Sequence, residues 1–194
     1  MANADSATGL RPVRYLSGAP YNGAANKYYI PATDTDTAAY IGSVVKLTGG
    51  ADADGIPAVT ANVATTNPVV GVVVGVVPTS ADSTIYRANS TARYVLVADD
   101  PNLVFEVQED SVGGALAATA AGATCPLTGF TTGSTTTGFS GIELDSSNVS
   151  ETSDTDDDVR IIGLVQRPDN AAGVNAKWLV RLNVHQYVNA AVGV

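Results

Sequence analysis

Very few side chains in this sequence are of the types that usually carry out catalysis. His185 is the single histidine and Cys125 the single cysteine. A serine or cysteine hydrolase needs a histidine base that a carboxylate orients beside the nucleophile. No Gly-x-Ser-x-Gly elbow is present, and Cys125 precedes Pro126 in a stretch of small residues. We therefore interpret His185 as structural or interfacial, and we expect no catalytic residues and no enzyme activity.

The carboxylates give no better candidate for a reactive or metal-binding site. Glu106 and Glu109 are three positions apart in a predicted strand, so they point to opposite faces and cannot act as an acid/base pair. The run Asp154–Asp158 resembles the start of a calcium loop. An EF-hand would have Gly at its sixth position and Glu at its twelfth, where this chain has Val159 and Val165. We interpret the run as a solvated acidic loop and predict neither a metal nor a cofactor.

The composition favours a β protein that does not bind nucleic acid. The 194 residues are 45% hydrophobic but only 15% charged, and small and β-branched residues are abundant. Helical bundles are rich in Leu, Glu, Lys and Arg instead. The net charge of −9 opposes contacts with phosphates, which need clustered Lys and Arg. One cysteine permits neither an intrachain disulfide nor a Cys-rich zinc site.

No targeting or membrane segment is predicted. The N-terminal residues Met1–Arg14 lack the apolar core of a signal peptide. The most apolar stretch, Val69–Val77, has nine residues, whereas a membrane-spanning helix needs about 20. We expect synthesis in the cytoplasm and no contact with a membrane.

Strand patterns recur from residue 39 onward. We predict strands over 39–47, ending at the turn Gly49-Gly50, and over 69–77, buried on both faces or bulged at a glycine. The segments 92–98 and 103–109 flank the turn 99–102, which is typical of a β-hairpin. Two further strands are predicted over 159–165 and 177–184. This spacing indicates an all-β domain, an antiparallel β-sandwich, jelly-roll-like fold or barrel, over residues 31–194.

Residues 111–158 carry weaker signals. Ala115–Ala121 has good helix propensity and precedes Gly122, so it is the one short helix we predict. The Thr/Ser/Gly/Asp-rich stretch 129–158 is poor in large residues, and we interpret it as a surface excursion.

Residues 1–30 form a predicted extended N-terminal arm. They have no strand or helix period, yet they contain half of the eight tyrosines. Rings in such a segment must be buried on something, either a neighbouring molecule or the arm's own domain, and the sequence leaves both open. The candidate partner-binding residues are Arg11, Arg14, Tyr15, Tyr21, Tyr28 and Tyr29.

Several short strings, in their order and spacing over nearly the whole chain, resemble a family of structural proteins of tailed-bacteriophage virions, of the capsid decoration or cement type. The strings are 9–14, 20–24, 28–31, 86–88, 97–101, 105–110, 143–147, 167–170 and 178–181. The resemblance implies a β-sandwich or jelly-roll-like body on the outer surface of an icosahedral head. It also implies contact with the major capsid protein, a homodimer or homotrimer, and no active site.

A second function stays open on the sequence alone. The alternative is a recognition module, a head-fibre or tail adhesin that binds host glycan. In that case, the Thr/Gly tract 129–141 and the loop 145–158 would be the exposed binding surface.

Overall fold

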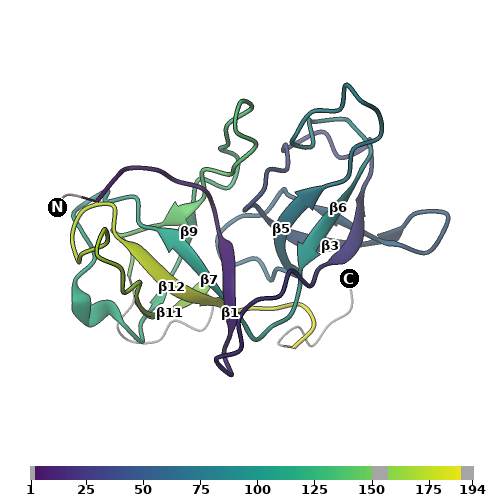
Figure 1. Cartoon of the computed structure of the whole chain (residues 1–194). Coiled ribbons are helices and arrows are strands. Elements are labelled where there is room, and N and C mark those ends of the chain that lie inside the picture. The colour runs from purple at the N-terminus through teal and green to yellow at the C-terminus, as the bar shows by residue number, and fades with distance from the viewer. Residues whose placement is uncertain (1–2, 150–156, 189–194) are drawn as a thin grey trace.

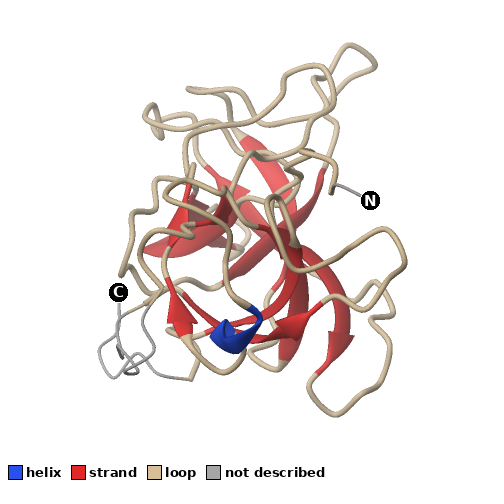
Figure 2. Ribbon diagram, turned by 90° about the vertical axis from the view of Figure 1, so that its left-hand side faces the viewer, coloured by secondary structure: helices blue, strands red, loops and turns tan. Residues whose placement is uncertain are grey.

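The protein consists almost wholly of β-strands, as the sequence predicts. A computed structural model describes residues 3–149 and 157–188. These residues form twelve strands, one three-residue 3-10 helix and no α-helix (Figure 2). The strands are β1 Arg11–Tyr15, β2 Asn26–Ile30, β3 Val44–Ala51, β4 Pro57–Thr60, β5 Gly71–Val76, β6 Arg93–Ala98, β7 Leu103–Gln108, β8 Thr124–Cys125, β9 Leu127–Thr128, β10 Glu143–Leu144, β11 Val159–Leu164 and β12 Lys177–Leu182.

Five of these strands close into a barrel in the order β2-β4-β3-β5-β6. All neighbours are antiparallel except β2 and β4, which pair in parallel through Tyr29 and Ala58. The barrel is filled by small and β-branched side chains, among them Ile30, Val45 and Val59, none of which is exposed. The abundance of valine in the sequence therefore fills a narrow interior that larger residues would overpack.

The second body is an antiparallel sheet in the order β1-β7-β12-β11-β8, beside the pair β9–β10. Figure 1 shows the two bodies side by side. The inner face of the sheet carries fully buried Phe105, Trp178 and Val180. The core cluster around them also includes Val44 and Val72 of the barrel strands, so one hydrophobic core joins both bodies.

The chain returns from the sheet to the barrel after β12. The amide of Val69 donates to the carbonyl of Val184 over 3.1 Å, and the amide of Gln186 donates to the carbonyl of Val69 over 2.8 Å. The side-chain oxygen of Gln186 accepts from the amide of Leu47 in β3 at 2.7 Å. Residues 183–188 therefore tie the sheet to the barrel.

The predicted hairpin of 92–98 and 103–109 is wrong. β6 pairs with β2 and β5 inside the barrel, whereas β7 pairs with β1 and β12 in the sheet. Both hydrogen-bonding edges of each strand are thus occupied by other strands. The tight turn between them carries the chain from one body to the other, and β7, buried along its whole length, is a central strand.

The glycine predictions have mixed outcomes. β3 runs through Gly49 and Gly50, so the turn predicted there is wrong. The next turn follows at Asp52, whose carboxylate accepts from the amides of Asp54 and Ile56. The predicted bulge in the valine-rich strand is confirmed, because the register of β5 against β6 shifts between Val73 and Gly75.

The segment 111–158 contributes more to the core than its composition suggests. In place of an α-helix over 115–121, a 3-10 helix spans Ala118–Ala120. Ile142 and Leu144 are 1% and 0% exposed, so the predicted surface excursion is wrong for this part of it. Leu144 of β10 pairs with Leu127 of β9, which is also buried, so β10 lies against the core. Residues 150–156 of the acidic loop lie outside the described residues.

Residues 3–30 pack on their own chain. β1 is an edge strand of the sheet and pairs with β7, while β2 is a strand of the barrel. Of the two placements left open by the sequence, the described residues show the second, in which the segment wraps around its own domain.

Candidate docking face

Cationic side chains gather on the outer face of the five-stranded sheet, opposite the buried Phe105 and Trp178. Arg160 of β11 stands directly across from Arg181 of β12, so both side chains share one face. Lys177 lies on that face as well, because residues four apart in a strand point the same way. The alternation of β12 thus places Lys177, Leu179 and Arg181 outward while Trp178, Val180 and Leu182 point to the core.

The N-terminal strand adds two more cations to the same face. Leu179 of β12 pairs with Glu106 of β7, and Glu106 pairs with Arg11 of β1. Arg14 pairs with Val104, which lies two residues from Glu106 and therefore on its face. The face so defined, the cationic face, holds half of the ten Lys and Arg residues: Arg11, Arg14, Lys177, Arg160 and Arg181.

None of these five side chains forms an ion pair with an acid among residues 3–149 and 157–188. The ion pairs there are Arg87–Asp34, Arg167–Glu106 and Arg167–Asp169. Three of the five make only backbone contacts: Arg14 with the carbonyl of Tyr15, Arg160 with that of Gly122 and Arg181 with that of Pro101. A sheet face with five cations outside these ion pairs thus stands out in a chain of net charge −9.

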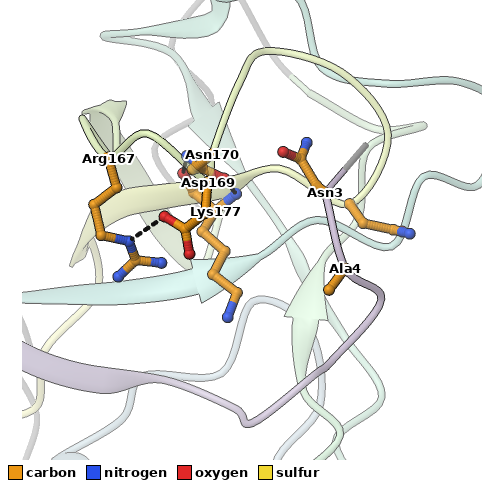
Figure 3. A pocket seen from close by; sticks show the side chains of 7 residues that line it. Asn3, Ala4, Arg167, Asp169, Asn170 and Lys177 are labelled. Carbon is orange, nitrogen blue, oxygen red and sulfur yellow. Dashed lines mark hydrogen bonds and ion pairs between the residues drawn. The ribbon is translucent and has the colours of Figure 1, made fainter. Parts of the chain in front are cut away.

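Acids also lie on or beside this face. Gln108 of β7 pairs with Lys177, and its side-chain amide donates to the carboxylates of Asp5 and Glu143, at 3.0 Å each. Glu106 binds Arg167 instead. Both oxygens of Glu106 accept from Nη1 of Arg167, at 2.8 and 3.1 Å. The Nε of Arg167 also lies 3.3 Å from Asp169 (Figure 3). The one positive charge of Arg167 is therefore shared between Glu106 and Asp169.

A small polar pocket of about 140 Å³ opens at one end of the cationic face. Figure 3 shows Arg167, Asp169 and Asn170 on one side of it, and Asn3 and Ala4 of the N-terminal segment on the other. Asn175 and Lys177 complete the lining. Lys177 therefore belongs both to the pocket and to the cationic face.

The tyrosines predicted as anchors are divided between the two bodies. Tyr15 and Tyr21 are half-buried and pack against the large core. Tyr29 is also half-buried, with its ring 5.4 Å from that of Tyr94 on the barrel. The structure thus brings Arg11 and Arg14 together with the other cations but separates them from Tyr29.

Tyr28 is a correction to the predicted anchors, because its side chain is 2% exposed. Its hydroxyl donates to Asp99 at 2.6 Å and lies 2.7 Å from the hydroxyl of Tyr187. Burial raises the pKa of Tyr28, and the bond to Asp99 raises it further. Tyr28 therefore binds within the protein and offers no surface to a partner.

The side chains weighed for catalysis are buried and apart from the cationic face. His185 is 1% exposed, its Nδ1 accepts from the amide of Tyr187, and burial lowers its pKa. Cys125 is fully buried with its Sγ against the carbonyls of Pro126 and Asp145, and burial raises the pKa of the thiol. Among the described residues, no three His, Cys, Asp or Glu side chains lie close enough together to hold a metal ion.

Arg160, Lys177 and Arg181 were missed by the sequence analysis. The alternation of 177–182 contains the signal that Lys177 and Arg181 share a face. It does not indicate that β7 connects this strand to β1, which lies more than 160 positions earlier in the sequence.

No helix in the described parts of the chain has the length and hydropathy to span a membrane. Comparisons with protein-family models, with curated proteins and with solved structures find no match to this chain.

Proposed function

We propose that this protein is a structural component of a tailed-bacteriophage virion, a decoration protein that binds the outside of the head through its cationic face. The proposed docking surface rests on five cations that share one sheet face of an acidic chain and form no ion pair within the described residues. The similarity of the sequence strings to decoration proteins supports the virion role. The barrel and sheet supply a stiff body on which such a face is held in place.

The positive charges of the cationic face favour an acidic protein surface as the partner. In this proposal that surface belongs to the major capsid protein. One exposed ion pair contributes only about 0.2 to 1 kcal/mol. Five cations on neighbouring strands act together, however, and copies repeated over a shell add the effect of multivalent attachment. The acids elsewhere on the protein oppose attraction to packaged DNA. A homodimer or homotrimer on the shell remains part of this proposal.

Copy number in purified particles tests the virion role. Particles from the source that encodes this chain are separated on a denaturing gel, and the protein is quantified against the major capsid protein. Hundreds of copies per particle support a decoration protein. A dozen or fewer support an adhesin, and absence from the particles contradicts both.

Charge variants test the docking face. Heads that lack the protein are incubated with the wild type or with the double variant Arg160→Gln/Arg181→Gln, and bound protein is measured after sedimentation. We expect the double variant to bind at least about tenfold more weakly at low salt.

The matched control removes two cations from the barrel. In Lys27→Gln/Lys46→Gln the change in net charge is the same, but Lys27 lies over the ring of Tyr94 and Lys46 donates to Asn67. The control variant should bind as the wild type does. Equal loss in both variants would show that net charge, and not the cationic face, governs attachment.

A further inference from the structure

The pocket at the end of the cationic face has rigid walls. The side-chain NH₂ group of Asn170 donates to the backbone carbonyls of Val165 and Lys177, at 2.8 and 3.0 Å. Its side-chain oxygen accepts from the backbone amide of Lys177 at 2.8 Å. On the other side, Asn3 donates to the carbonyls of Ala171 and Val174 and accepts from the amide of Ala171. Six hydrogen bonds within the protein therefore hold the two walls in place, so binding would order little further chain.

Two of the lining side chains offer hydrogen-bond donors with no acceptor among the described residues. Lys177 is half-buried, and its ammonium group forms no ion pair or hydrogen bond there. The side-chain oxygen of Asn175 accepts from Ser111, which leaves its NH₂ group free. Asn175 adopts a positive φ of 59°, a left-handed conformation that is uncommon but more frequent for Asn than for most residues.

Volume and charge restrict what can enter. A space of about 140 Å³ is roughly that of four or five water molecules, enough for the end of one side chain. Asp169 contributes a carboxylate to the lining, and it shares the charge of Arg167 with Glu106. A singly charged group with two acceptor oxygens matches one ammonium and one amide, and Asp169 repels it less than it repels a doubly charged phosphate.

We propose that this pocket receives a single carboxylate group, the side chain of an Asp or Glu on the partner protein, with Lys177 as its charge partner. The inference rests on the proposed function, because it names the anchor point within the cationic face. The walls made by Asn3 and Asn170 orient the entering side chain, while the remaining cations of the face supply attraction over a longer range.

A titration of the isolated protein tests the pocket without any capsid. The probe is N-acetyl-glutamate α-amide, which carries one carboxylate, and the uncharged N-acetyl-glutamine α-amide is the matched control. We expect saturable shifts in the NMR signals of the side-chain amides of Asn3 and Asn175, with a dissociation constant in the millimolar range at low salt. The glutamine compound should cause none.

Variants assign the effect to Lys177. Lys177→Gln and Lys177→Met should each weaken binding at least about fivefold, while Arg160→Gln, on the same sheet face but outside the pocket, should retain it. Backbone spectra of each variant establish that the fold is kept. Equal shifts with both compounds, unchanged binding in the Lys177 variants, or tighter binding of inorganic phosphate than of the carboxylate would each overturn the proposal.

The experiments distinguish a failure of the pocket proposal from a failure of the proposed function. If the titration fails but Arg160→Gln/Arg181→Gln still releases the protein from heads, the pocket is not the anchor and the docking face stands. If the carboxylate binds but head attachment is insensitive to the cationic face, the pocket is real and the proposed function is wrong.

Discussion

At the scale of single residues, the clearest departure from the sequence prediction is Asp158. The acidic run that contains it was interpreted as solvated, yet Asp158 is 6% exposed. One oxygen accepts from the amide of Thr66 at 3.0 Å and the other from the amide of Leu127 at 2.8 Å. Asp158 therefore connects a loop after the barrel strand β4 to β9, and its burial is structural.

Burial makes Asp158 sensitive to pH. Loss of solvation raises the pKa of Asp158 to about 6, and the negative charge of Asp157 adds to the rise, although the two amide bonds oppose it. The folded pKa thus exceeds the unfolded value of 3.8. The folded state binds the proton more tightly, so the stability from this group is full below pH 3.8 and is lost as the pH rises through 6.

The variant Asp158→Asn isolates this contribution. From pH 7.5 to pH 5, the free energy of unfolding of the wild type should increase by about 1 kcal/mol more than that of the variant. Urea denaturation at the two pH values measures both differences. Burial lowers the pKa of His185, so its contribution to stability decreases as the pH falls. This contribution is the same in both proteins and cancels in the comparison. An identical pH dependence in both would show that Asp158 is not the titrating group.

Single residues also show what the sequence could and could not predict. It identified Arg11 and Arg14 as cations available to a partner, and the structure places both on the cationic face. It gave no sign of Arg87, which is fully buried and donates to the carbonyls of Thr37, Pro31 and Thr91. These acceptors lie in loops, so no side-chain pattern in the sequence identifies them.

At the scale of elements, the two glycines of β5 have different roles. A methyl group at Gly71 would lie 2.8 Å from Cγ1 of Val97 and 2.9 Å from Cα of Asp99, and it would also meet the carbonyl oxygen of Ala98. At Gly75 the nearest atom would be Cδ1 of Leu96 at 3.4 Å, an ordinary contact. Gly71 is therefore required where β5 meets the end of β6, whereas Gly75 is not.

Alanine at the two positions makes a matched pair. Gly71→Ala should lower the free energy of unfolding by about 2 kcal/mol or more, because backbone atoms must move to admit the methyl group. Gly75→Ala should change it by less than about 1 kcal/mol. Urea denaturation of both variants at one pH measures the difference. Equal destabilisation would mean that β5 does not approach β6 as described.

Strand positions were more predictable than strand partners. The strands predicted over 159–165 and 177–184 correspond to β11 and β12, which pair as neighbours. The segments 92–98 and 103–109 carry equally clear patterns, yet they belong to different bodies. The alternation of apolar and polar residues indicates which side chains of a strand are buried. It does not indicate which other strand, often distant in the sequence, will hydrogen-bond to it.

At the scale of the whole molecule, charge is unevenly distributed. A net charge of −9 predicts an acidic surface throughout, yet the fold gathers five cations on one face by pairing β1 with β7 and β7 with β12. The strands concerned come from both ends of the chain, so the face exists only in the folded protein. A patch of sign opposite to the rest of the surface orients the molecule toward an acidic partner.

The orientation of the protein on the particle tests this account most directly. A cryo-EM reconstruction of the particle that carries the protein shows which face meets the shell. The account predicts that the outer face of the β1-β7-β12-β11-β8 sheet lies against the capsid, with Arg160 and Arg181 within about 4 Å of capsid carboxylates. A reconstruction in which this face points to solvent while the barrel contacts the shell would contradict it.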